Sequence, residues 1–312
     1  MLGSKKITIF EVGPRDGLQN ESKKVSLQQK IRLVSSLVDC GLKEIEVGAL
    51  VRKNRVPQMA DTSLMVKKIQ NDKKLMKSFN PWVLVPNLKG LEKAIDLGVK
   101  NIAVFTASTD SFTKKNIGFT VKDSLREINQ VVQVAKSQKI KVRAYVSTAM
   151  GCPFEGKVSH KQSISVIRSL LDLGVFQVSI GDTIGVATPK QVEKVIYPLM
   201  KKYNQKQIAV HFHDTRGGAL ANTLRAIDLG VRVVDSSVGG LGGCPFAPGA
   251  SGNLSTEDLV YFLDGMGFQT GVDLKKLSKV SLQFSRSIKR PITSRYLQAV
   301  MNQKNKKSHR YF

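Results

Sequence analysis

The chain has 312 residues, of which 41% are hydrophobic and 23% charged, a globular composition that excludes a disordered protein. No apolar run reaches the roughly 18–20 residues that a membrane-spanning helix needs, and no secretory signal pattern precedes Ile7, so no membrane partner is expected. The net charge of +25 raises the hypothesis of a nucleic-acid partner.

The excess of lysine is spread along the chain as short pairs, and a dense basic run occurs only at Lys304–Arg310. Nucleic-acid binding needs a localised basic patch with aromatic stacking residues, whereas aromatic residues make up 6% of the chain and lie mostly on apolar segments. We therefore interpret the charge as a solvated basic surface and expect no nucleic-acid partner. Attraction of a polyanionic substrate is the alternative.

The three cysteines, Cys40, Cys152 and Cys244, are an odd number and lie far apart, which argues against a disulfide framework. A reducing compartment is the simplest setting for such a chain. A cytoplasmic location is therefore expected.

Strand-like and helix-like segments alternate from Ile7 onwards. The first predicted helix, Ser26–Cys40, shows the expected helix signals, with apolar residues at helical spacing, an N-cap serine and Gly41 just after its end. The predicted strands are Ile7–Gly13, Glu44–Leu50, Trp82–Pro86, Asn101–Ala107, Lys141–Ser147, Gln177–Thr183, Ile208–Asp214 and Val231–Val238. The other predicted helices are Thr62–Asn71, Lys89–Leu97, Val121–Gln138, Lys161–Leu173, Pro189–Tyr203, Ala219–Leu229, Thr256–Met266, Leu274–Lys289 and Ser294–Asn302.

This alternation predicts an α/β fold, a (β/α)8 TIM barrel with additional C-terminal helices, in preference to a six-stranded open sheet. The strands are apolar runs, as expected where both faces of a parallel sheet are covered. We predict one catalytic domain over residues 1–312. The barrel would occupy about 7–255, and the C-terminal helices and basic tail about 256–312.

Two histidines stand together on the predicted strand Ile208–Asp214. A strand sends residues i and i+2 to the same face, so His211 and His213 would point the same way. The chain has only four histidines, which makes the pairing of two on an apolar strand notable. Convergent imidazoles suggest half of a metal site, and the competing interpretation is a pair of hydrogen-bonded structural histidines.

A barrel collects its chemistry at the C-terminal ends of its strands. Asp16, after the first strand, would add a carboxylate to the two imidazoles, and Asn253 could add an amide oxygen. Mixed nitrogen and oxygen ligation suits Mg²⁺, Mn²⁺, Co²⁺ or Zn²⁺ and leaves positions for a substrate. Arg15 can hydrogen-bond an oxyanion through its planar fork, unless Arg15 and Asp16 form only a loop ion pair.

Cys244 lies in a glycine-rich loop after the last predicted strand, where a thiol near a cation can act as an acid or nucleophile. Cys40 and Cys152 have no comparable surroundings, and we interpret them as structural.

Eight motifs in order resemble the 3-hydroxy-3-methylglutaryl-CoA lyase family, within a wider group of metal-dependent TIM-barrel lyases and Claisen synthases. They are Gly13–Glu21, Val56–Asp61, Pro86–Gly90, Phe112–Asn116, Gly151–Pro153, Gly181–Gly185, His211–Thr215 and Gly239–Pro245. The resemblance covers about Ile7 to Leu277. The chain departs from the family over Val47–Arg55, and the part after about Ser281 matches only loosely.

The resemblance implies a retro-Claisen cleavage of 3-hydroxy-3-methylglutaryl-CoA to acetyl-CoA and acetoacetate, in leucine degradation and ketone body formation. It implies an acyl-CoA substrate, a homodimer and a divalent cation, with Mg²⁺ or Mn²⁺ expected. The implied roles are cation binding by Asp16, His211, His213 and Asn253, catalysis by Cys244 and Arg15, substrate binding by Arg15, Gln19 and Asp182, and support by Glu46.

Three groups are candidates for the first base: His211, His213 and Asp182. A Claisen synthase acting on acetyl-CoA and a 2-oxo acid is the first alternative function. A basic nucleic-acid-binding protein is the remote one.

Overall fold

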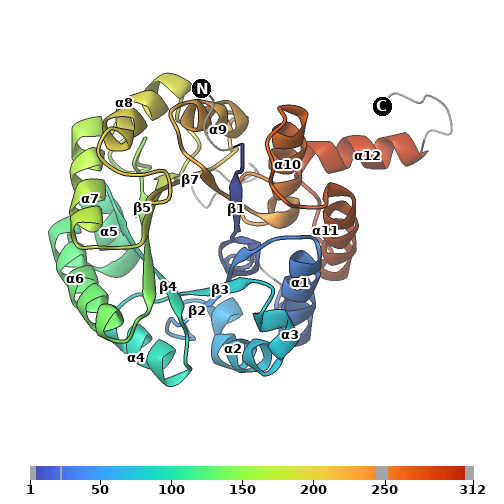
Figure 1. Cartoon of the computed structure of the whole chain (residues 1–312), viewed down its shortest axis with the longest axis horizontal. Helices are drawn as coiled ribbons and strands as arrows, with labels where there is room; N and C mark the ends of the chain where they lie inside the picture. The colour runs from blue at the N-terminus through green and yellow to red at the C-terminus, as the bar shows by residue number, and fades with distance from the viewer. Residues whose placement is uncertain (1–4, 22, 244–251, 306–312) are drawn as a thin grey trace.

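Eight parallel strands close into a barrel in the computed structural model, which describes residues 5–21, 23–243 and 252–305 (Figure 1). Each strand pairs with the next in the chain, and β8 pairs with β1. The strands are β1 (Thr8–Glu11), β2 (Glu44–Ala49), β3 (Asn80–Leu84), β4 (Asn101–Ala107), β5 (Lys141–Ser147), β6 (Gln177–Asp182), β7 (Ile208–Phe212) and β8 (Val233–Ser236). The predicted (β/α)8 fold is confirmed.

Helices fill the connections and surround the strands (Figure 1). They are α1 (Leu27–Asp39), α2 (Thr62–Asn71), α3 (Lys73–Met76), α4 (Leu88–Asp96), α5 (Asp110–Ile117), α6 (Val121–Ser137), α7 (His160–Asp172), α8 (Pro189–Met200), α9 (Ala219–Asp228), α10 (Thr256–Gly265), α11 (Leu274–Ile288) and α12 (Arg295–Asn305). Three short turns are η1 (Gly13–Gly17), η2 (Pro57–Met59) and η3 (Val238–Gly240). Among the described helices, none combines the length and apolar character that crossing a membrane requires.

The apolar strands are buried on both faces, as their sequences predict. In β7, Ile208, Ala209 and Val210 are fully buried between the barrel interior and the surrounding helices. Helix α1 begins as expected, with a capping box in which Ser26 accepts from the N–H of Gln29 and the Gln29 side chain accepts from the N–H of Ser26. A local cap therefore fixes the start of α1, and burial on both faces fixes the place of β7 in the sheet.

Several details differ from the sequence prediction. The short helix α3 was not predicted, the strand predicted as Ile7–Gly13 ends at Glu11 before η1, and the strand predicted as Trp82–Pro86 is β3, Asn80–Leu84. The prediction missed α5, whose sequence carries no apolar period but which ends on Gly118 in the left-handed conformation.

The predicted strand Ile208–Asp214 is too long, because β7 ends at Phe212 and His213 instead forms an isolated bridge with Asn253. This bridge brings the segment before α10 against the barrel mouth.

The C-terminal helices α10, α11 and α12 lie together on the β1 side of the barrel, and α12 points away from it (Figure 1). The Thr256 hydroxyl at the start of α10 donates to Glu11 Oε2 on β1 (2.7 Å), and the Ile7 N–H donates to the Gln269 carbonyl (3.0 Å). The C-terminal segment is thereby hydrogen-bonded to the strand that begins the barrel.

Candidate active site

The turn after β1 places two charged side chains at the C-terminal end of the barrel. In η1, a π-helical turn, the N–H groups of Asp16 and Gly17 both donate to the Val12 carbonyl (2.8 and 3.2 Å). This tight turn directs Arg15 and Asp16 toward the mouth, where Glu46 of β2 and His211 of β7 also lie. The strand-end rule therefore holds for these positions.

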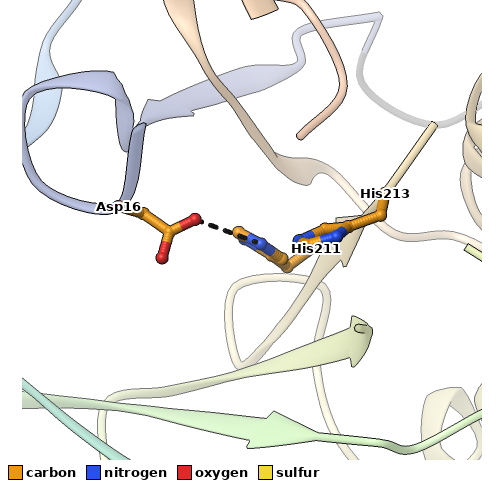
Figure 2. A group of neighbouring side chains, drawn as sticks. All are labelled: Asp16, His211 and His213. Carbon is orange, nitrogen blue, oxygen red and sulfur yellow. Dashed lines mark ion pairs between the residues drawn. The ribbon is translucent and has the colours of Figure 1, made fainter. Parts of the chain in front are cut away.

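Asp16, His211 and His213 converge, as Figure 2 shows. One ligand atom from each residue lies within 4.8 Å of those of the other two, and His211 Nε2 is 3.9 Å from Asp16 Oδ2. His213 Nδ1 is buried and has no hydrogen-bond partner among the described residues. A buried nitrogen without a partner is costly unless something binds it, so the donor set fits a divalent cation.

The electrostatics of this cluster favour the ligand forms of Asp16 and His213, whereas the pKa of His211 is raised, because its burial is outweighed by the hydrogen bond and charge of Asp235. Burial raises the pKa of Asp16, but Arg15 and His211 outweigh it and lower the pKa to about 2. Burial, with His211 adding to it, lowers the pKa of His213 to about 4. At neutral pH the first group is therefore a carboxylate and the second a neutral imidazole, the forms that bind metal ions.

Two amide side chains hold Asp16 in place. Asn253 donates through Nδ2 to Asp16 Oδ2 (2.8 Å), and Gln19 donates through Nε2 to Asp16 Oδ1 (2.8 Å). Both residues thus belong to the cluster. Cation binding by Asn253 and substrate binding by Gln19 stay predictions.

Arg15 is a nearly buried cation between two carboxylates. Its Nε donates to Glu46 Oε2 (2.5 Å) and its Nη1 to Asp16 Oδ1 (2.8 Å), while the Tyr145 hydroxyl also donates to Glu46 Oε2 (3.1 Å). Although burial acts to lower the pKa of Arg15, the charges of Glu46 and Asp16 raise it, so the guanidinium stays charged. Glu46 therefore holds Arg15 in its orientation, and its supporting role in the site stays a prediction.

A buried network behind His211 was not anticipated from the sequence. His211 Nδ1 lies 3.2 Å from Asp235 Oδ2 on β8, which also accepts from the Ser179 hydroxyl (2.8 Å). Arg143 on β5 donates to the other Asp235 oxygen (2.5 Å), and both side chains are fully buried. The available signal was a charged residue inside each of two otherwise largely apolar strands, Arg143 in β5 and Asp235 in β8.

Asp182 lies at the end of β6 with both carboxylate oxygens engaged. They accept hydrogen bonds from the N–H groups of Val186 (3.1 Å) and Ala187 (2.9 Å), so Asp182 holds the loop that follows β6. Burial raises its pKa. Substrate binding by Asp182 stays a prediction.

Cys244, the expected catalytic thiol, lies outside the described residues, while Cys40 and Cys152 are buried and free.

Comparisons with known proteins match the chain to one family. The HMGL-like family model matches residues 6–283. A human protein named mitochondrial hydroxymethylglutaryl-CoA lyase is 46% identical over 295 residues, 95% of this chain and 90% of that protein. A mouse cytoplasmic 3-hydroxy-3-methylglutaryl-CoA lyase is 43% identical over 296 residues, 95% of this chain and 85% of that protein.

Among solved structures, an HMG-CoA lyase from Acinetobacter baumannii in complex with coenzyme A and 3-methylmalate superimposes with a TM-score of 0.90. It is 32% identical, and the match covers 100% of both chains. The predicted resemblance and the enzyme class, a hydroxymethylglutaryl-CoA lyase, are confirmed by these matches. With strand order, mouth geometry and sequence in agreement, this chain belongs to the HMGL-like family.

Proposed function

We propose that this chain cleaves 3-hydroxy-3-methylglutaryl-CoA to acetyl-CoA and acetoacetate. The observation that carries the proposal is the convergence of Asp16, His211 and His213 beside the buried Arg15 at the mouth of the barrel. Membership of the HMGL-like family and the relative that binds coenzyme A support an acyl-CoA substrate.

Asp16, His211 and His213 would hold a divalent cation, Mg²⁺ or Mn²⁺, and the amide oxygen of Asn253 is the proposed further ligand. The buried Nδ1 of His213, which no described residue hydrogen-bonds, and the mixed oxygen and nitrogen donors support this assignment. When bound, such a cation polarises substrate oxygens and makes a tertiary hydroxyl more acidic.

Arg15 supplies a fixed positive charge where the thioester enolate forms. Glu46 and Asp16 hold its guanidinium through Nε and Nη1, so the group is oriented before the substrate arrives. A preorganised donor of this kind stabilises an oxyanion without reorganisation, typically by a factor of about 10²–10³ in rate. Cys244 is proposed to return the proton to the enolate carbon.

The test is turnover of the thioester by the purified chain with Mn²⁺ or Mg²⁺, with and without a chelator. Acetoacetate should be released only with the metal, and His213→Ala should lose both turnover and cation binding because it removes one imidazole. Full activity of metal-stripped His213→Ala would overturn the cation site. Coenzyme A release that depends on a 2-oxo acid, without acetoacetate, would indicate a Claisen synthase instead.

The remaining proposals concern the setting of the enzyme. We propose a homodimer, which sedimentation analysis can check, and a place in leucine degradation and ketone body formation. The compartment proposed is the cytoplasm, the location in the name of the mouse relative, whereas the human relative is named mitochondrial. The free, buried Cys40 and Cys152 support a reducing compartment.

A further inference from the structure

Arg290 follows α11 and reaches two loops of the barrel mouth. Its Nε lies 2.9 Å from Glu21 Oε1 in the loop after η1. Its Nη1 and Nη2 donate to the carbonyls of Gly240 (3.3 Å) and Gly242 (3.2 Å), in the segment after β8. The Arg290 and Glu21 side chains are only 16% and 17% exposed, so this fork of contacts is largely shielded from water.

Thr293, in the same segment after α11, makes a second set of contacts with the loop after β8. Its hydroxyl lies within hydrogen-bonding distance of the carbonyls of Gly239 (3.3 Å) and Gly240 (3.1 Å). Gly240 has a φ of +66°, and a Cβ there would lie 2.1 Å from Thr293 Oγ1. Only glycine lets the residues after α11 press directly on the backbone of this loop.

The loop after β8, which Arg290 and Thr293 contact, is connected to the cation cluster through Asn253. Between the two carbonyls held by Arg290, the Leu241 carbonyl accepts from Asn253 Nδ2 (3.2 Å), and the same nitrogen donates to Asp16 Oδ2 (2.8 Å). A Cβ on Gly242 would lie 2.7 Å from Asn253 Nδ2, so the packing there leaves no room for a shift. Moving the loop therefore moves the partners of Asp16.

We propose that Arg290 is a positioning residue that brackets the loop after β8 to the loop after β1 and thereby holds Asn253 and Asp16 in their working arrangement. The proposal rests on the proposed function for its catalytic consequence. Arg290 lies beyond residue 283, where the match to the family model ends, and it touches none of the proposed reacting groups.

The experiment compares the full-length wild type with Arg290→Met, Arg290→Lys and Glu21→Gln. Arg286→Met is the matched control, because Arg286 is an exposed arginine on α11. Four quantities are measured: kcat and KM for the thioester, Mn²⁺ affinity by calorimetry, and hydrogen exchange of the backbone amides of residues 238–243. Circular dichroism checks that each variant is folded.

Arg290→Met should lower kcat roughly 10- to 100-fold with KM changed less than about 3-fold, since a misplaced site loses rate more than substrate binding. Mn²⁺ affinity should fall, and the amides of residues 238–243 should exchange faster. Arg290→Lys should recover part of the loss, because lysine keeps the charge toward Glu21 but not the fork toward two carbonyls. Arg286→Met should match the wild type.

If Arg290→Met does not fold, Glu21→Gln carries the test, with smaller changes in the same direction. If a folded Arg290 variant shows unchanged amide exchange over residues 238–243, the positioning role of Arg290 is overturned. A kcat of that variant equal to the kcat of Arg286→Met overturns it as well. If the wild type never cleaves the thioester, only the proposed function is overturned. The effects of Arg290→Met on amide exchange and on Mn²⁺ affinity would still test the positioning role of Arg290.

Discussion

Asp235 determines which ring nitrogen of His211 faces the cation cluster. With Nδ1 held 3.2 Å from Asp235 Oδ2, the opposite nitrogen is turned toward Asp16. Burial raises the pKa of Asp235, but the charge of Arg143 outweighs it and the pKa is lowered, so the group stays a carboxylate. A carboxylate behind a ligating histidine fixes its orientation and increases its basicity.

We predict that Asp235→Asn lowers Mn²⁺ affinity and turnover roughly 10- to 100-fold, the usual effect of losing such a partner. Calorimetry and steady-state kinetics measure the two effects. Ser179→Ala is the control, because it removes a hydrogen bond to the same carboxylate and leaves its charge. Equal behaviour of the two variants would contradict the role of the charge.

Glu11 gives the protein a pH-dependent stability. Burial raises its pKa from 4.5 to about 7, despite hydrogen bonds from Thr256, Val238 and Gly13 that act in the opposite direction. The folded state thus binds this proton more tightly than the unfolded chain does. The stabilisation is complete below about pH 4.5 and decreases as the pH rises to about 7, by about 3 kcal/mol in all.

Glu11→Gln should remove this dependence, because glutamine mimics the protonated acid. We predict that the free energy of unfolding of the wild type, relative to Glu11→Gln, falls by about 3 kcal/mol between pH 4.5 and 7. Urea titrations across that range measure it. Glu257, whose pKa burial raises to about 6 and whose charge also raises the pKa of Glu11, remains in both proteins, so the difference reports Glu11 together with its interaction with Glu257. A difference that is constant with pH would refute the prediction.

Some residues of the site could be predicted from the sequence, and others could not. Asp16, His211 and His213 could be found because each follows or ends a strand, and strand ends meet at one mouth of a barrel. Arg143 and Asp235 could not be paired in advance, because their contact crosses the barrel and depends on the closed register of the strands. Spacing along the chain carries no record of such a contact.

At the scale of elements, the loop after β1 is held from two sides. Arg290 contacts it from the segment after α11, and Gln58 in η2 contacts it from the segment after β2. The Gln58 amide donates to the carbonyls of Glu21 (2.8 Å) and Lys23 (2.5 Å) and accepts from the Val25 N–H (3.1 Å). One side chain therefore satisfies three backbone groups that no strand or helix pairs.

Replacing Gln58 by leucine should cost about 1–3 kcal/mol of unfolding free energy, because the Val25 N–H is buried and would lose its acceptor. Chemical denaturation measures the change. Gln133→Leu, at an exposed position on α6, should change it by less than about 0.5 kcal/mol. A similar cost for both variants would mean that the hydrogen bonds of Gln58 contribute nothing of their own to stability.

Elements with a strong period were predictable, and those fixed by tertiary contacts were not. The predicted bounds of α2, β4 and β5 agree with the structure to the residue, because each is an apolar run or stripe between turns. The helix α5 is polar and short, so its sequence resembles a loop, and the end of β7 depends on the bridge from His213 to Asn253. Tertiary contacts of this kind override local propensity.

For the whole molecule, a bound cation adds to stability by mass action. At a free Mn²⁺ concentration about 100 times its Kd, the proposed site should raise the free energy of unfolding by about 2.7 kcal/mol. Thermal unfolding with and without Mn²⁺ measures the increase in Tm. His213→Ala should show no increase, and an equal increase in that variant would place the binding elsewhere.

The predicted single domain is open to the same measurement. The hydrogen bond from Thr256 of α10 to Glu11 of β1, and the one from the Ile7 N–H just before β1 to the Gln269 carbonyl, join the C-terminal segment to the barrel. One cooperative transition is therefore expected. Two separate transitions would instead indicate that the C-terminal helices unfold on their own.

Because β1 pairs with β8, the first strand cannot complete its pairing until the last strand has been synthesised. Thr8 of β1 lies opposite Val233 of β8, and at ~5–20 residues per second the ribosome needs roughly 10–45 s to make the chain between them. Until then one edge of β1, with its apolar Ile9 and Phe10, has no strand to pair with. The yield of folded enzyme in a cell therefore depends on how well that edge is protected before the ring closes.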